Sequence, residues 1–118
     1  MGITFIAGSV KGEGPDEASL DFLVDSGSQY TLLPEEVWQQ IGLSAQRTQR
    51  FRLADGTVME REISNCLLRL PEFGTTPTPV ILGEPGDVAL LGAVTLEELG
   101  LVLNPFNRTL HPADLLLA

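Results

Sequence analysis

Short apolar segments recur along the whole chain, separated by clusters of glycine, proline and polar residues. In several of them apolar and polar residues alternate, which is typical of strands with one buried face, whereas residues 88–92 are continuously apolar and predict a strand buried on both faces. Glycine and proline predict loops at residues 11–16, 74–77 and 83–87. The pattern therefore predicts a mostly β fold. The predicted strands cover residues 3–10, 19–24, 30–33, 66–70, 79–82, 88–92, 101–103 and 109–111.

Two short helices are predicted to interrupt this β pattern. The first begins at Pro34 and ends before Gly42, because proline suits the first helical position and glycine the position after the last. The second follows Thr95 as its N-cap, with Glu98 completing a capping box and Gly100 just past its end.

A β-hairpin is predicted in the middle of the chain. Strand-like residues 49–53 and 57–63 flank Ala54-Asp55-Gly56, and Asp-Gly favours a tight turn in which both positions adopt a positive φ. Charged and apolar residues alternate on both sides of the turn. This alternation predicts a hairpin that stands partly in solvent.

The composition narrows the class of protein. With 118 residues, 43% apolar and 19% charged, the chain is expected to form one soluble domain over residues 1–118. The formal net charge of −9 disfavours nucleic acid and anionic membranes as partners, because their phosphates would be repelled. No apolar run approaches the length of about 20 residues that a membrane span needs.

The chain has one cysteine, Cys66, and one histidine, His111. An internal disulfide is therefore excluded, and a zinc site would need several carboxylates in addition. Cys66 lies in a strand-like segment and is interpreted as a small core residue. The start of the chain has no basic region followed by an apolar core, so a cytoplasmic protein without a signal peptide is expected.

The candidate chemistry lies in Asp25-Ser26-Gly27-Ser28, directly behind the apolar run 20–24. Burying a carboxylate at the end of a core strand is costly unless it is paired or hydrogen-bonded, so Asp25 needs an explanation. The sequence contains this site only once. Acid–base chemistry with carboxylates usually needs two of them.

This arrangement resembles the retropepsin-like aspartic proteases, a family of single-domain enzymes. The resemblance covers most of the chain: an Asp-Ser-Gly turn behind a strand, an exposed hairpin around Asp55-Gly56, and Leu90-Leu91-Gly92 leading into a short helix. It implies a closed β-barrel with a flap hairpin and one or two short helices. It also implies a homodimer that hydrolyses peptides or proteins without a metal or other cofactor.

The resemblance assigns roles to the residues of the turn. Asp25 of each subunit would form a catalytic pair that activates a water molecule. Ser26 would hydrogen-bond across the dimer, and Gly27 would allow close approach of backbone and substrate. Ser28 adds a hydroxyl that is expected to hydrogen-bond the Asp25 carboxylate and to lower its pKa, which predicts an acid-shifted activity optimum.

Residues outside the turn receive supporting roles. Leu91 and Gly92 would pack behind the turn without reacting, and Ala54, Asp55 and Gly56 would form the tip of the flap that covers the substrate.

Three alternatives remain open at this stage. In the first, Asp25 only caps a turn in a non-catalytic β domain, because Asp-Ser-Gly is favourable turn chemistry by itself. A retropepsin-like domain can also serve as a non-catalytic dimerisation or peptide-binding module. A serine hydrolase that uses Ser26 or Ser28 would need His111 as its base, and it lacks the Gly-x-Ser-x-Gly motif.

Overall fold

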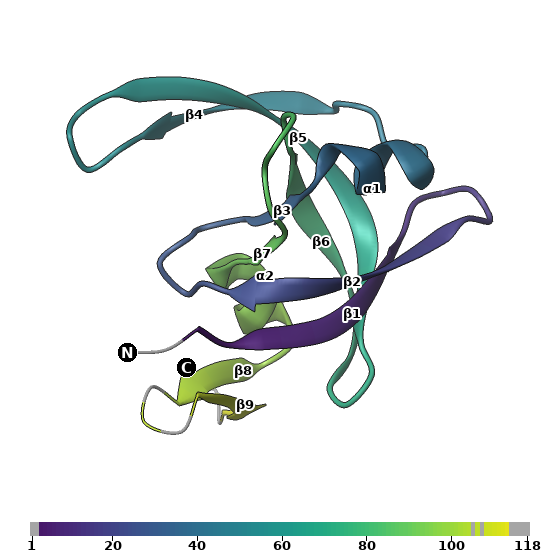
Figure 1. Ribbon diagram of the computed structural model, residues 1–118, viewed down its shortest axis with the longest axis vertical. Helices are drawn as coiled ribbons and strands as arrows, with labels where there is room; N and C mark the ends of the chain where they lie inside the picture. Colours follow the sequence, from purple (N-terminus) through teal and green to yellow (C-terminus); the bar gives the residue numbers. More distant parts are fainter. Residues whose placement is uncertain (1–2, 105, 107, 114–118) are drawn as a thin grey trace, which may run out of the picture.

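The computed structural model describes residues 3–104, 106 and 108–113, and the chain is mostly β, as predicted (Figure 1). Two short helices, α1 (Glu35–Gln40) and α2 (Ala93–Glu98), accompany the strands. Neither they nor any other helix of the described residues is long and apolar enough to cross a membrane. The strands are β1 (Phe5–Lys11), β2 (Glu17–Val24), β3 (Thr31–Leu33), β4 (Arg47–Arg52), β5 (Val58–Leu70), β6 (Gly74–Leu82), β7 (Leu90–Leu91), β8 (Leu101–Asn104) and β9 (Thr109–Pro112).

One sheet dominates the structure and closes on itself. Its strands follow the order β1-β2-β7-β3-β6-β5-β4, and β1 also pairs with β5. This additional pairing makes the arrangement ring-like, with β4 outside the ring at the edge of β5. Strands β8 and β9, close to the predicted strands 101–103 and 109–111, form a separate antiparallel pair.

The interior is filled by large aliphatic and aromatic side chains from opposite strands. Phe22 of β2, Leu33 of β3, Leu68 and Leu70 of β5 and Leu91 of β7 are completely buried. Each such side chain stabilises the fold by about 1.5–3 kcal/mol relative to an exposed one. Completely buried side chains are thus present on both strands that flank Asp25, β2 and β3.

Strand β7 separates the two strands that precede and follow the Asp25 turn. It pairs in parallel with β2, where Val24 lies opposite Leu91, and antiparallel with β3, where Leu32 lies opposite Leu90. The turn between β2 and β3 must therefore pass the end of β7. A segment some 65 residues later in the chain thus supports the turn directly.

Strands β5 and β6 are longer than the sequence predicts. Residues 66–70 belong to the continuous 13-residue strand β5, and residues 74–77, predicted as a loop, are the beginning of β6. Pro77 and Pro79 lie opposite Leu67 and Asn65. Because the two prolines are two residues apart, their nitrogens face the same side, and the one residue between them, Thr78, lies opposite Cys66 and can bond to β5.

The predicted capping box is wrong. Helix α2 begins at Ala93 with Gly92 as N-cap, and Thr95 is a completely buried residue inside the helix. Gly100 does follow the helix, with a φ of +69°. The predicted strand 88–92 is also too long, because only Leu90 and Leu91 form a strand, β7, that pairs with its neighbours.

Candidate active site

Asp25 is the first residue after β2, and its main chain is held from both sides. Its N–H donates to the Leu91 carbonyl oxygen at 3.0 Å, and the N–H of Val24 donates to the Thr4 carbonyl oxygen at 2.8 Å. The Asp25 side chain is half-buried. The backbone is therefore fixed by the sheet, while the carboxylate remains accessible.

The carboxylate of Asp25 is oriented by the turn that follows it. Its Oδ1 accepts a hydrogen bond from the Gly27 N–H at 3.0 Å, and the Ser28 N–H donates to the Asp25 carbonyl oxygen at 3.1 Å. A Cβ on Gly27 would lie only 3.3 Å from Oδ1, so a larger residue would crowd the carboxylate. Asp25 makes no ion pair with any described residue. Its charge is thus held in place but not neutralised within the chain.

The two serines of the turn differ in their surroundings. Ser26 is exposed, and its hydroxyl has no hydrogen-bond partner within the described part of the chain. Ser28 Oγ donates to the Tyr30 carbonyl oxygen at 2.9 Å, so the expected bond from Ser28 to the Asp25 carboxylate is wrong. The physical reason is local: the Gly27 amide already orients that carboxylate, and the Ser28 hydroxyl satisfies a backbone acceptor two residues ahead. The structural basis for an acid shift through Ser28 is therefore lost.

Leu91 and Gly92 lie behind the turn. Leu91 is completely buried and contributes the carbonyl group that holds Asp25. Gly92 donates its N–H to Thr31 Oγ1 at 3.0 Å. A Cβ on Gly92 would overlap the backbone of Tyr30, so only glycine fits between β7 and β3 at this point.

Helix α2 is anchored to the same turn through its first amides. The N–H of Ala93 donates to the Ser28 carbonyl oxygen at 2.8 Å, and the N–H of Val94 donates to that of Gln29 at 3.0 Å. The first amides of a helix have no partner within the helix. Here the turn supplies their acceptors, which couples its path to the start of α2.

Three buried threonines extend this support, and sequence reasoning missed them. Thr95 Oγ1 shares hydrogen bonds with Thr31 Oγ1 at 2.6 Å and with Thr78 Oγ1 at 2.8 Å. None of the three is more than 1% exposed. Together with the bond from Gly92 to Thr31, they join β3, β6, β7 and α2. In the sequence each of these threonines is a polar residue within an apolar or strand-like segment. Nothing in the sequence indicates that the three contact one another.

The predicted hairpin joins β4 and β5, and its turn is built differently from the predicted one. The Leu53 carbonyl oxygen accepts the Gly56 N–H at 2.9 Å, and Asp55 Oδ1 accepts the Thr57 N–H at 2.9 Å. Gly56 has a φ of +89°, whereas Asp55 does not adopt a positive φ. The connection is therefore a three-residue loop over residues 54–56, closed by a glycine, and not a two-residue Asp-Gly turn. The Thr57 hydroxyl and amide hold the pKa of Asp55 below its usual value.

The base of the hairpin contacts the segment that follows the Asp25 turn. Figure 1 shows the hairpin projecting from the body of the molecule. The rings of Phe51 and Tyr30 meet edge to face, with centroids 5.9 Å apart and an interplanar angle of 87°. Both pack against a small apolar cluster made by Leu32, Ile63 and Ile81. The rings of Tyr30 and Phe51 thus form an apolar surface that runs from the segment after the turn to the inner side of the hairpin, which is the face that carries Arg47, Phe51 and Arg61.

An ion pair ties the hairpin to the loop after β6. Arg61 Nη2 and Asp87 Oδ2 are 2.6 Å apart, and the same carboxylate oxygen accepts the Glu84 N–H at 2.8 Å. The Glu84 amide and, to a smaller extent, Arg61 hold the pKa of Asp87 below its usual value. This link joins two segments that both flank the apolar surface.

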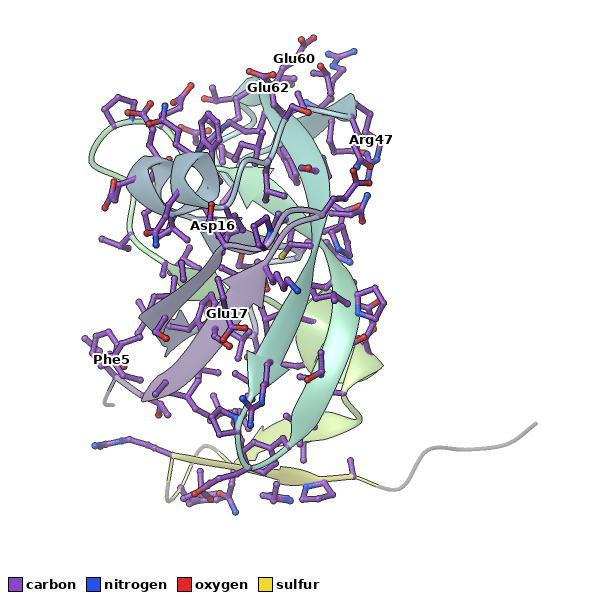
Figure 2. The ribbon with its side chains drawn as sticks, turned by 90° about the vertical axis from the view of Figure 1, so that its right-hand side faces the viewer. Phe5, Asp16, Glu17, Arg47, Glu60 and Glu62 are labelled. Carbon is purple, nitrogen blue, oxygen red and sulfur yellow. The ribbon has the colours of Figure 1, made fainter. Side chains whose placement is uncertain are left out.

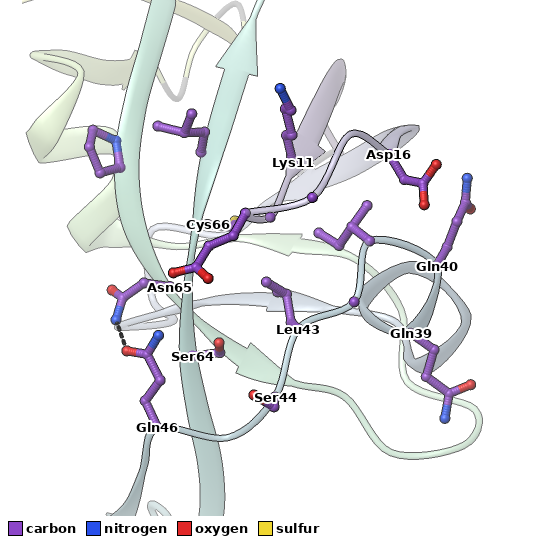
Figure 3. Close-up of a pocket in the computed structure, with 17 residues that line it drawn as sticks. Lys11, Asp16, Gln39, Gln40, Leu43, Ser44, Gln46, Ser64, Asn65 and Cys66 are labelled. Atoms are coloured by element: carbon purple, nitrogen blue, oxygen red, sulfur yellow. Dashed lines mark hydrogen bonds between the residues drawn. The ribbon is translucent and has the colours of Figure 1, made fainter.

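Two hollows lie away from Asp25. The larger, of about 820 Å³, is bounded by the turn after β1, the end of α1 and the middle of β5 (Figure 3). Asn65 donates to Gln46 there at 2.6 Å, and burial raises the pKa of Cys66 to about 12. The smaller, of about 420 Å³, lies along β1 and β2. Neither is lined by any of the predicted site residues.

Other candidate chemistry gains no support from the described residues. Among them, no group of three or more His, Cys, Asp or Glu side chains is placed to hold a metal ion. His111 is exposed on β9, and its Nδ1 lies 3.3 Å from the Pro112 carbonyl oxygen. Neither Ser26 nor Ser28 hydrogen-bonds this histidine.

Comparison with known proteins agrees with this geometry. The sequence model of the aspartyl protease family matches residues 6–95, from β1 to the middle of α2. No curated protein sequence matches the chain. The matched region contains the Asp25 turn, the β4–β5 hairpin and the β7 segment behind the turn. The chain therefore belongs to the retropepsin-like aspartyl proteases.

Proposed function

We propose that this protein is an aspartic endopeptidase that acts as a homodimer. Each subunit contributes one Asp25 carboxylate to a shared site, and the substrate is a peptide or protein chain. The observation that carries the proposal is the Asp25 carboxylate itself, which is accessible, oriented by the Gly27 amide and without an ion-pair partner in the described chain.

The need for a second carboxylate supports the dimer. Carboxylate-based peptide hydrolysis uses a pair of acids that share one proton, and the Asp25 turn supplies one of them. The unpartnered hydroxyl of Ser26, next to Asp25, suits a hydrogen bond to a second copy of the turn. The chain carries a net charge of −9, so a dimer carries −18, twice that value, and its association should strengthen with added salt or mild acidification.

The proposed reaction follows from the proximity of two carboxylates. At a separation of about 3 Å both cannot ionise, so the pair holds a single proton. The ionised Asp25 accepts a proton from a bound water, whose oxygen attacks the carbonyl carbon of the peptide bond. The protonated Asp25 donates to the carbonyl oxygen. The C–N bond of the tetrahedral intermediate then breaks, and the departing nitrogen takes up a proton from the pair.

The β4–β5 hairpin is proposed to act as the flap over the substrate. Its tip is exposed and carries the apolar side chains of Leu53 and Val58, which are 45% and 38% exposed. Its inner side continues the apolar surface around Tyr30 and Phe51. An extended peptide between the hairpin and the turn would contact both.

Cleavage of a mixed peptide library by the wild type and by Asp25→Asn tests the proposal. We expect the substitution to reduce cleavage at least about a thousandfold, because it replaces the Asp25 carboxylate of both subunits and leaves no group in the pair that can exchange a proton. Asp21→Asn is the matched control, since Asp21 is an exposed carboxylate on β2, the strand that leads into Asp25, and it should retain activity. Wild-type specific activity should rise with protein concentration, and an excess of Asp25→Asn protein should inhibit by forming mixed dimers.

Two results would contradict the proposal. Activity that survives in Asp25→Asn would exclude Asp25 as the catalytic group. A folded dimer that cleaves no peptide between about pH 4 and pH 8 would instead favour the non-catalytic dimerisation or peptide-binding module.

A further inference from the structure

Positive charge is concentrated on the β4–β5 hairpin of an otherwise acidic protein. The chain has seven Lys and Arg residues against sixteen Asp and Glu residues. Four of the seven are arginines within residues 47–63. These are Arg47, Arg50, Arg52 and Arg61.

One face of the hairpin, here called its outer side, carries Arg50, Glu60 and Glu62, so positive and negative side chains lie on it together. Arg50 lies directly opposite Glu60 in the register of β4 and β5, and Thr48 lies opposite Glu62. In Figure 2 Glu60 and Glu62 lie together near the top of the view, and Arg47 lies apart from them. Opposite charges at such cross-strand positions attract one another. Arg50 thus has a carboxylate on its own side of the hairpin, although the two side chains form no ion pair.

The inner side of the hairpin leaves one guanidinium without a carboxylate. Arg61 pairs with Asp87. Arg47 instead donates from Nη1 to Gln49 Oε1 at 2.7 Å and from Nη2 to the Tyr30 hydroxyl at 3.3 Å. Both of these acceptors are neutral, and no Asp or Glu among the described residues pairs with Arg47.

Arg47 lies where the hairpin meets the segment after the catalytic turn. Its Cζ lies 5.9 Å from the centroid of the Tyr30 ring, within the range of a cation–π contact. The Tyr30 carbonyl in turn accepts the hydroxyl of Ser28, in the turn itself. The exposed guanidinium is thus pre-oriented beside the apolar surface formed by Tyr30 and Phe51.

We propose that Arg47 is a specificity residue that binds an acidic side chain of the substrate. The substrate class is then a peptide with Glu or Asp near the scissile bond, next to an apolar or aromatic residue that contacts Tyr30 and Phe51. This inference rests on the proposed function, because it concerns the same substrate path. A guanidinium fork suits carboxylates in particular, since two of its N–H groups can donate to the two carboxylate oxygens.

The size of the preference follows from the exposure of Arg47. An accessible ion pair contributes little compared with a buried one, so we expect a preference of about fivefold in kcat/KM for Glu over Gln at the responsive position. The overall negative charge of the protein repels acidic peptides at long range. Peptides in the comparison must therefore have equal net charge, with the compensating residue placed at a distant end.

The experiment uses matched peptides that carry Glu, Gln or Lys at each position around an apolar cleavage site, at about pH 6, where Glu is ionised. Cleavage is measured with the wild type. Binding of the same peptides to Asp25→Asn protein is measured by fluorescence anisotropy, which needs no catalysis. The variants are Arg47→Gln and Arg47→Glu. Arg50→Glu is the control, because it changes the same charge on the other side of the same strand.

We expect Arg47→Gln to abolish the preference for Glu and Arg47→Glu to reverse it toward Lys, while Arg50→Glu keeps it. A merely structural role for Arg47 would lower all rates together and would not reverse a preference. Cleavage or binding without a Glu preference, or a preference that Arg50→Glu changes equally, overturns the inference while the protease remains. If no peptide is cleaved, the proposed function fails, and the binding of Glu and Gln peptides still decides the role of Arg47.

Discussion

The Asp25 turn and the tip of the β4–β5 hairpin are both built around a short Asp-containing turn, but they differ in what supports them. The Asp25 turn and the residue before it are hydrogen-bonded to β7, to α2 and to the chain before β1. The hairpin tip is held by bonds among residues 52–57 only, and every residue from 52 to 58 is exposed. One turn is positioned by the whole fold and the other only by itself.

This difference matches the proposed division of labour. A carboxylate that shares a proton with a second copy must be placed accurately, and its position is determined by several independent contacts. A flap must open for the substrate and close over it, so a tip with few tertiary contacts is suitable. The two turns both contain an Asp and a Gly. The number of tertiary contacts therefore distinguishes the turn proposed to react from the hairpin tip proposed to cover the substrate.

The same substitution in the two regions should have very different effects. In Gly92→Ala the new methyl group overlaps the backbone of Tyr30, so we expect a loss of at least about 3 kcal/mol in the free energy of unfolding. In Gly56→Ala the space is open and only the positive φ is strained, which costs about 1 kcal/mol. Urea unfolding followed by circular dichroism measures both.

Gly14→Ala is the control for these two variants. Its Cβ would meet no atom within 4 Å, and its φ lies outside the positive range, so stability should be unchanged. Equal losses for Gly92→Ala and Gly56→Ala would show that the two turns are not supported differently.

Removing the hydroxyl at the centre of the threonine network should destabilise the support of the Asp25 turn. Thr95→Val keeps the shape of the side chain but takes a hydrogen-bond partner from both Thr31 and Thr78, so a loss of about 2 kcal/mol is expected. Thr95→Ser keeps the hydroxyl and should lose less. If Thr95→Ser proves less stable than Thr95→Val in thermal or urea unfolding, packing of the methyl group and not the hydrogen bonds accounts for the role of Thr95.

The smallest expected effect concerns the link between the hairpin and the loop after β6. Asp87→Asn removes the charge that pairs with Arg61 and should cost about 1 kcal/mol at neutral pH, a low value because the Asp87 side chain is 33% exposed. The folded-state pKa of Asp87 is lowered, so this stabilisation is present above the ordinary Asp pKa of about 3.9 and is lost as pH falls through the lower folded value.

Unfolding of the wild type and of Asp87→Asn across this pH range measures the effect. The two stability curves should converge only at the acidic end. A constant difference at all pH values would show that the ionised form of Asp87 is not what stabilises the link.

Much of the architecture was predictable because local patterns were strong. The apolar run before Asp25, the exposed hairpin and the pair of strands near the C-terminus were all predicted with the right element type. The errors lie where tertiary contacts override local preference. Residues 74–77 are predicted as a loop but form the beginning of β6, and Thr95 is predicted as an N-cap but is buried at the centre of a hydrogen-bond network.

By itself the sequence determined a mostly β fold, a single Asp-Ser-Gly turn behind a buried strand, and the position of the hairpin, because each depends on neighbouring residues and their periodicity. Only the tertiary structure decided that Ser28 bonds Tyr30 and not Asp25, that three distant threonines share hydrogen bonds, and that Arg47 lacks a carboxylate partner. These depend on which side chains the closed sheet brings together. No local pattern records that, because contacts across a sheet join residues tens of positions apart in the chain.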